Sequence, residues 1–386
     1  MTKVFLHVGA PKTGTSMVQE LLYNNRKVLA EHGVLYPGRR RDAHFMAALD
    51  LLERTWGGLE VDAPGSWDYL AGKAQKWDGT VVISHEVFAG ASEEQAKRAI
   101  SSLEGCDVHV VYTARDLSRQ VPAEWQEQVK HRKKHPYAAY LKDLTSDDPQ
   151  NYSSRWFWAV HDWPDVLKRW SRDIPEENVH LVTVPPPGSP RALLIDRLLS
   201  LWGIEQEWLT KESNRANVSL GAVETTVLRK INKRNPPATY DGPYYREWVR
   251  ELLAHRTLAG RDGAQRLILP PDHLDWARDL SGRWTDELRS RAYDIRGDLD
   301  ELRVIDDNGD YVDPDKVADA GQLNVALDVI DTLLAELVHE RERGAGAARE
   351  AEERGDQRVQ EALAAQQRRR RRLRRFAGRV RRKLRL

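Results

Sequence analysis

Several residue types are scarce in this sequence, and their scarcity limits what the protein can be. The single cysteine, Cys106, excludes an intrachain disulfide, a cysteine-based zinc site and a cysteine-ligated iron–sulfur cluster. It also predicts a reducing compartment. No apolar run approaches the roughly 18–20 residues of a membrane span, and the N-terminus shows no signal-peptide pattern. These absences predict a cytoplasmic protein.

The chain contains enough hydrophobic residues to bury a large core. Of the 386 residues, 40% are hydrophobic, which excludes global disorder. This length fits one large domain, or one domain with appendages.

Charge is unevenly distributed along the chain. Residues 368–386 contain twelve Arg or Lys and no acid, although the whole chain has a formal net charge of only +1. Subtracting these twelve from the 60 basic residues leaves 48 against 59 acidic ones, a net charge of −11 for residues 1–367. An acidic body and a basic tail need separate explanations.

The first half of the chain alternates between strand-like and helical patterns. The β-branched runs are mostly continuous, as in strands buried on both faces of a parallel sheet, and they span residues 3–8, 80–84, 107–113 and 178–184. Helical patterns occupy residues 15–31, 41–55, 93–104, 118–133, 153–171 and 190–202. The alternation predicts an α/β fold, a P-loop-like open parallel sheet flanked by helices. Ligands of such sheets bind beyond the carboxyl ends of the strands.

No strong strand signal returns after about residue 204. Four helices are predicted instead, at residues 219–234, 244–256, 281–303 and 322–343. We therefore expect an α/β domain over 1–305, a linker and helix over 306–345, and a charged helical tail over 346–386.

The loop after the first predicted strand has the composition of an anion site. It contains Pro11, Lys12, Thr13, Gly14, Thr15 and Ser16, and a helical pattern follows at once. Glycine lets the backbone approach a ligand, the helix N-terminus offers N–H groups, and Lys12 adds a charge. A plain turn is the weaker interpretation. A Walker A loop needs its lysine directly after the second glycine, where this chain has Thr15.

The form PKTGTS resembles the 5′-phosphosulfate loop of sulfotransferases that use 3′-phosphoadenosine 5′-phosphosulfate (PAPS). In that family the arginine after a later strand and a following serine bind the 3′-phosphate. Arg115 matches the arginine. Ser118 is the expected serine, although some branches place it where this chain has Ala123. The alternative role for Arg115 is a surface ion pair with Asp116.

The second predicted strand ends at Ser84 and is followed by His85 and Glu86. Sulfotransferases place their general base here, as a histidine in some branches and a glutamate in others. Neighbouring side chains on an extended backbone point in different directions, so only one should face the acceptor. We favour Glu86 and keep His85 as the alternative.

The resemblance covers roughly residues 1–305 and implies further properties. Asn217 and Ser219 lie in a segment similar to the one that covers the nucleotide in this family, although Ser219 could also be a helix N-cap. The family transfers a sulfuryl group from PAPS to a hydroxyl or amine without a metal. The acceptor would be a small molecule, carbohydrate or glycolipid. A nucleotide-dependent kinase and an inactive sulfotransferase-like binding protein are the alternatives.

Other features bear on partners rather than on chemistry. The 13 tryptophans are expected mainly in the core, with sugar platforms as the alternative. The basic run 130–134 is interpreted as a solvated helix end rather than a path for an anionic acceptor. The Leu-rich segment 323–338 could mediate homo-oligomer formation.

The basic tail predicts contact with a membrane surface. As a helix, residues 368–386 align the apolar side chains within about 100°, namely Leu373, Phe376, Ala377, Val380 and Leu384. A cationic helix with such a stripe can lie on anionic lipid at the inner leaflet. A solvated tail is the main alternative. Nucleic acid is a weaker partner, and we expect no specific nucleic-acid binding.

Overall fold

The computed structural model describes residues 1–190, 192–213, 219–239, 241–304 and 309–383. By internal contacts the chain divides into two compact units, Met1–Ala326 and Leu327–Leu386. The first unit contains the sheet and most of the helices, and the second is helical.

A six-stranded parallel sheet forms the centre of the first unit, in the order β2-β3-β1-β4-β5-β6. The strands are β1 Lys3–Gly9, β2 Val34–Leu35, β3 Thr80–Ser84, β4 Asp107–Ala114, β5 Val179–Thr183 and β6 Asp294–Arg296. All four predicted strands are present, and the predicted fold class is confirmed. Because β1 lies between β3 and β4, the three loops proposed to carry the chemistry leave the same edge of the sheet side by side.

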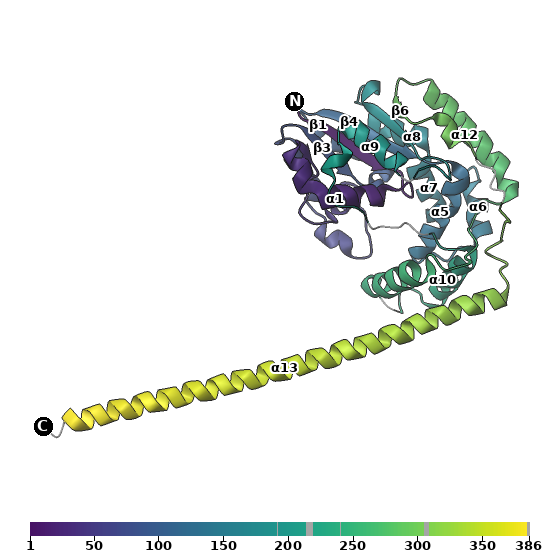
Figure 1. Ribbon diagram of the computed structural model, residues 1–386. Coiled ribbons are helices and arrows are strands. Elements are labelled where there is room, and N and C mark those ends of the chain that lie inside the picture. The colour runs from purple at the N-terminus through teal and green to yellow at the C-terminus, as the bar shows by residue number, and fades with distance from the viewer. Residues whose placement is uncertain (191, 214–218, 240, 305–308, 384–386) are drawn as a thin grey trace. The chain divides into compact units, whose positions relative to one another are not determined.

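Helices flank the sheet (Figure 1). In the first part they are α1 Thr15–Glu31, α2 Ala43–Leu51, α3 Ser66–Ala74, α4 Glu93–Ser101, α5 Leu117–Lys130, α6 Tyr137–Leu144, α7 Tyr152–His161, α8 Trp163–Ser171 and α9 Leu193–Trp202. Later come α10 Ala222–Arg234, α11 Gly242–Tyr244, the π-helical segment Tyr245–Leu258, α12 Leu274–Arg289 and α13 Asp319–Lys383. The predicted C-terminal helical extension is thus present as one continuous helix.

One face of the sheet is covered by α1 and α9. Their apolar residues share a buried cluster with one side chain from each of five strands, namely Phe5, Val34, Val82, Val111 and Val182. On the other face the Tyr112 hydroxyl donates a hydrogen bond to Val160 O of α7 at 2.8 Å. Burial on both faces explains why the strands read as continuous apolar runs.

Two sequence predictions were wrong in detail. The helix predicted over 281–303 ends at Arg289, and residues 294–296 form the edge strand β6 paired with β5. The helix predicted over 153–171 is interrupted at Asp162, whose side chain accepts the N–H of Asp165 and so caps a new helix. Within the described residues, no helix is long and apolar enough to span a bilayer.

Tryptophan packing holds the segment that follows β3. Trp67, Trp125, Trp163, Trp170 and Trp202 are among the largest fully buried side chains, so for these five the core prediction is confirmed. Trp170 of α8 donates from Nε1 to Phe88 O at 3.2 Å. Phe88 lies in the 3₁₀ turn Glu86–Gly90 (η2), so α8 supports the turn that begins with Glu86.

We predict that Trp170→Ala lowers the free energy of unfolding by about 3–5 kcal/mol, because it leaves a cavity and removes the hydrogen bond that Nε1 donates to Phe88 O. Trp248→Ala, at a half-buried position, is the matched control and should cost clearly less. Denaturant unfolding of both variants measures the difference. An equal loss of unfolding free energy in the two variants would show that Trp170 does not specifically stabilise this turn.

Candidate functional site

The loop between β1 and α1 places an N-terminal helix end above the sheet. Gly14 precedes α1 with φ of 90°, a conformation that favours glycine, and an added Cβ would lie 3.0 Å from Leu194 Cδ2. Lys12 also adopts a left-handed conformation, with φ of 64°. This is uncommon outside glycine and is typical of functional loops. Thr15 and Ser16 form the first turn of α1, where N–H groups lack helical partners.

The end of β4 fixes the backbone of this loop. Thr113 Oγ1 donates to Gly9 O at 2.7 Å, and Thr113 O accepts from Ala10 N at 2.9 Å. The buried Thr13 hydroxyl donates to Ala10 O at 2.6 Å and lies 2.6 Å from Thr113 Oγ1. The hydroxyl of Thr13 is therefore engaged inside the loop, and only its backbone remains to meet a ligand.

Lys12 forms an ion pair across the site. Its Nζ lies 3.0 Å from Glu127 Oε2 on α5, and both side chains are partly exposed. Burial alone would raise the pKa of Glu127, but Lys12 and the other nearby cations hold it well below its usual range. Glu127 thus provides Lys12 with a counter-charge that an incoming anion would have to replace or share.

Glu86 and His85 point to different surroundings, as expected of neighbours at a strand end. Glu86 Oε2 accepts hydrogen bonds from Thr15 Oγ1 at 3.1 Å and Gln19 Nε2 at 2.9 Å, so it faces the start of α1, next to the loop over residues 10–14, here called the anion loop. His85 instead accepts the N–H of Val87 at Nδ1, at 3.2 Å. A neutral ring that accepts at Nδ1 carries its proton on Nε2. Neither nitrogen then has a free lone pair with which to accept a proton from a substrate.

The protonation states favour the carboxylate. Burial raises the pKa of Glu86, but the neighbouring His85 and the hydrogen bonds from Gln19 and Thr15 outweigh this effect and bring the pKa below its ordinary value. Burial lowers the pKa of His85, so that ring is neutral at neutral pH and the hydrogen bonds stabilise the carboxylate. Glu86 is therefore ionised and able to accept a proton.

Arg115 follows β4 and is fixed by two contacts. Its Nε donates to Gln120 Oε1 and its Nη2 to Arg119 O, both at 2.9 Å. Burial lowers the pKa of Arg115 to about 10, with Asp116 acting against this and Arg119 and Arg266 adding to it, so the side chain remains charged at neutral pH. Asp116 caps α5 and pairs with Arg119, rather than forming a surface pair with Arg115.

Ser118 is buried, and its hydroxyl donates to Asp116 Oδ1 at 2.5 Å. Through this hydrogen bond Ser118 holds the Asp116 side chain that caps α5. Asn217 lies outside the described residues. Ser219 is exposed and is not an N-cap, because α10 begins after Gly221. Next to it, Leu220 O accepts from Gln126 Nε2 of α5 at 2.7 Å.

Gln120 joins two of the candidate loops. It is buried, accepts from Arg115 and donates from Nε2 to Pro11 O at 2.9 Å. Sequence reasoning missed Gln120 and Gln19, although Gln19 follows Thr15 by four residues and so shares its helix face. It also missed Arg266, whose charge acts on Arg115 from a distant part of the sequence.

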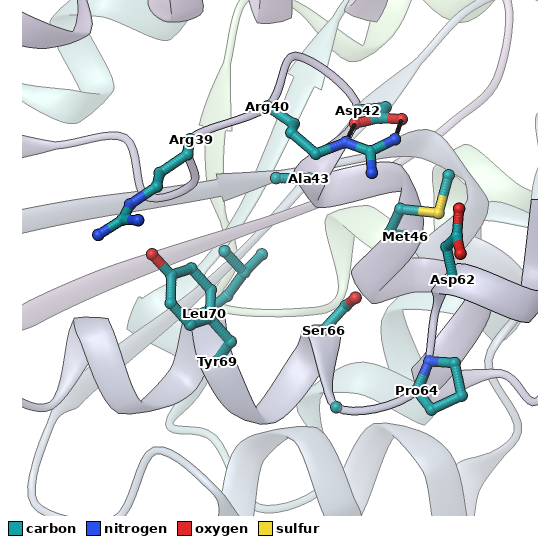
Figure 2. Close-up of a pocket in the computed structure, with 11 residues that line it drawn as sticks. Arg39, Arg40, Asp42, Ala43, Met46, Asp62, Pro64, Ser66, Tyr69 and Leu70 are labelled. Atoms are coloured by element: carbon teal, nitrogen blue, oxygen red, sulfur yellow. Dashed lines mark hydrogen bonds and ion pairs between the residues drawn. The ribbon is translucent and has the colours of Figure 1, made fainter. Parts of the chain in front are cut away.

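A cavity that the structure describes lies away from these strand ends. It measures about 390 Å³ and is lined by residues of α2, α3 and the segments before them, including the Arg40–Asp42 ion pair in Figure 2. None of the candidate residues lines it. Among the residues described here, no three His, Cys, Asp or Glu side chains gather as a metal site would require.

Comparisons with known proteins give a distant likeness in fold. No protein-family model and no curated protein matches the chain. Among solved structures, it is similar to a sulfotransferase domain from the curacin biosynthetic pathway, with 13% identity and a TM-score of 0.35. The match covers 76% of this chain and 98% of that domain. At this similarity the likeness decides nothing about activity.

We predict that Gln120→Leu weakens binding of adenosine 3′,5′-bisphosphate by about 10- to 100-fold, because the loop and Arg115 lose a shared partner. Gln128→Leu is the control, since Gln128 is also buried but donates to Glu124 instead. Calorimetric titration measures both. Equal weakening in the two variants would reduce Gln120 to a general stabiliser of the fold.

Proposed function

We propose that this protein is a sulfotransferase that transfers a sulfuryl group from PAPS to a hydroxyl or amine of a small-molecule, carbohydrate or glycolipid acceptor. The observation that carries the proposal is the convergence of three strand ends. The loop carrying Lys12, the carboxylate of Glu86 and the guanidinium of Arg115 leave adjacent strands, and hydrogen bonds through Thr15 and Gln120 connect them.

The charges of this site fit a nucleotide with two anionic ends. The first turn of α1 and Lys12 suit the 5′-phosphosulfate, since helix N-termini and lysine both stabilise phosphate groups. Arg115, with Arg266 close by, suits the 3′-phosphate. Pro11, Thr13, Gly14 and Ser16 would contribute loop backbone and the Ser16 hydroxyl, and Asn217, Ser118 and Ser219 remain proposed contacts.

The proposed reaction is an in-line displacement at sulfur. The acceptor oxygen forms a new bond to sulfur while the bond between sulfur and the phosphate oxygen breaks, and adenosine 3′,5′-bisphosphate leaves. Glu86 accepts the acceptor's proton, and Lys12 stabilises the charge that develops on the leaving oxygen. As in phosphoryl transfer, positioning and charge stabilisation supply most of the rate.

A kinase is the second candidate, and one observation favours it. Glu86 accepts from Thr15 at the start of α1, and a strand-end carboxylate beside a P-loop hydroxyl is also how nucleoside-triphosphate enzymes hold magnesium. Against it, Lys12 does not follow the second glycine of the loop. Turnover with ATP and magnesium, and none with PAPS, would establish the kinase.

We predict that Lys12→Ala and Glu86→Gln each lower the rate of sulfate transfer from labelled PAPS by about 10²–10⁴-fold. The controls are Lys27→Ala and Glu31→Gln, which make the same changes on the exposed side of α1. Unchanged turnover in Lys12→Ala or Glu86→Gln removes that residue from the mechanism. Loss of turnover in His85→Gln, with Glu86→Gln active, would assign the base to His85.

We also propose that the basic tail holds the enzyme at an anionic membrane surface, near a lipid-linked acceptor. The support is the twelve basic residues of 368–386 and the helix that includes most of them. Each basic residue near anionic lipid contributes up to about 1 kcal/mol, screened by salt.

Full-length protein should therefore sediment with vesicles that contain anionic lipid, and a variant with six tail arginines replaced by glutamine should bind much less. Neutral vesicles are the control. Equal sedimentation of both proteins at moderate salt would contradict membrane binding through the tail.

A further inference from the structure

A second cluster of charge surrounds Glu127, away from the contacts of Arg115. Besides Lys12, its carboxylate lies 3.8 Å from Lys130 Nζ, 3.2 Å from His131 Nε2 and 3.4 Å from Arg250 Nη2. Three cationic side chains, Lys12, Lys130 and Arg250, thus share the carboxylate of Glu127. We call Lys12, Lys130 and Arg250 the cationic cluster.

Lys130 contradicts the sequence prediction of a solvated helix end. Only 3% of its side chain is exposed. Burial and the charge of Lys12 lower the pKa of Lys130 to about 8, with Glu127 acting against this, so the amine is still mostly charged at neutral pH. Lys134, at the other end of the basic run, is exposed as predicted.

The cluster carries more positive charge than its protein partner can balance. Burial lowers the pKa of His131 and brings that of His255, near Lys130, to about 4, so both rings are neutral. The other buried carboxylate nearby, Glu124, faces His161 and Gln128 instead. Lys130 is the buried member of the cluster and shares Glu127 with two partly exposed cations, so a bound anion would lower the cost of burying its charge.

One donor in the cluster also lacks a partner. The Nε of Arg250 is buried and has no hydrogen-bond partner within the described part of the chain. This N–H is therefore available to donate a hydrogen bond to a bound anion. The guanidinium is suited to bind a planar anion such as a carboxylate.

Aromatic rings connect this cluster to the proposed base. The ring of Trp56 meets the His131 ring edge-on at 5.1 Å, and Phe45 lies 5.5 Å from Trp56 and 5.1 Å from His85, beside Glu86. An acceptor whose hydroxyl reaches Glu86 could therefore rest on this aromatic row and extend to the cationic cluster. Nothing in the row is shared with the contacts of Arg115.

We propose that Lys130 and Arg250 of the cationic cluster bind a negatively charged group on the acceptor, so that the substrate is an anionic hydroxyl compound bearing a carboxylate, sulfate or phosphate, while Lys12 faces the nucleotide. The inference rests on the proposed sulfotransferase function. Lys130 and Arg250 are specificity-determining residues in it, and Glu127 is the resting counter-ion that the acceptor's anion displaces from them.

The test uses full-length protein saturated with adenosine 3′,5′-bisphosphate, so that the phosphate positions are filled. Two matched pairs are titrated by calorimetry, 4-hydroxybenzoate against 4-hydroxybenzamide and glucuronate against glucose. The anionic member should bind about 10- to 100-fold more tightly than the neutral one in at least one pair.

Lys130→Gln and Arg250→Gln should each reduce this preference to near equality, while the affinity for the bisphosphate stays as in wild type. Lys134→Gln makes the same charge change at an exposed position. It should alter neither the anionic preference nor the affinity for the bisphosphate. Thermal unfolding checks that the variants fold. Because Lys130 is buried, the partly exposed Arg250 decides the matter if Lys130→Gln is unstable.

Two results would overturn the proposal. One is the absence of any anionic preference in wild type. The other is a loss of bisphosphate affinity in Arg250→Gln as large as the loss of affinity for the anionic probe. That result would assign the cluster to the nucleotide. If wild type does not bind the bisphosphate, the proposed function itself fails, and the same pairs titrated without nucleotide decide the anion site.

Discussion

The position of β1 between β3 and β4 is the constraint on which the rest of the site depends. Parallel pairing on both sides makes three loops leave the sheet at one edge, and the hydroxyl of Thr113 then fixes the loop after β1 to the end of β4. Because the loop backbone is held from outside, Lys12 can keep a left-handed conformation that is unfavourable for a residue with a Cβ.

Charge in the site is arranged around a few buried polar side chains. Gln120 connects the anion loop to Arg115, and Glu127 connects it to Lys130 and Arg250. Both side chains are on α5, so one helix orients the charged groups on two sides of the loop. A ligand that binds here would meet donors already positioned, which reduces the entropy lost on binding.

Sequence reasoning predicted the parts of this structure that depend on local pattern. The buried strands and the helix after the anion loop appear where their periodicity placed them, and Glu86 rather than His85 faces the loop. The edge strands β2 and β6 were missed because strands of two or three residues are too short to show a periodic pattern in the sequence. Lys130 was misjudged because its burial depends on side chains distant in sequence.

The central claim is that the loops after β3, β1 and β4 form a single site for a 3′-phosphorylated adenine nucleotide. Calorimetric titration of the full-length protein with adenosine 3′,5′-bisphosphate, without magnesium, tests it most directly. The account predicts saturable binding of the bisphosphate and no binding of ATP with magnesium. Binding of ATP with magnesium, together with no binding of the bisphosphate, would contradict it.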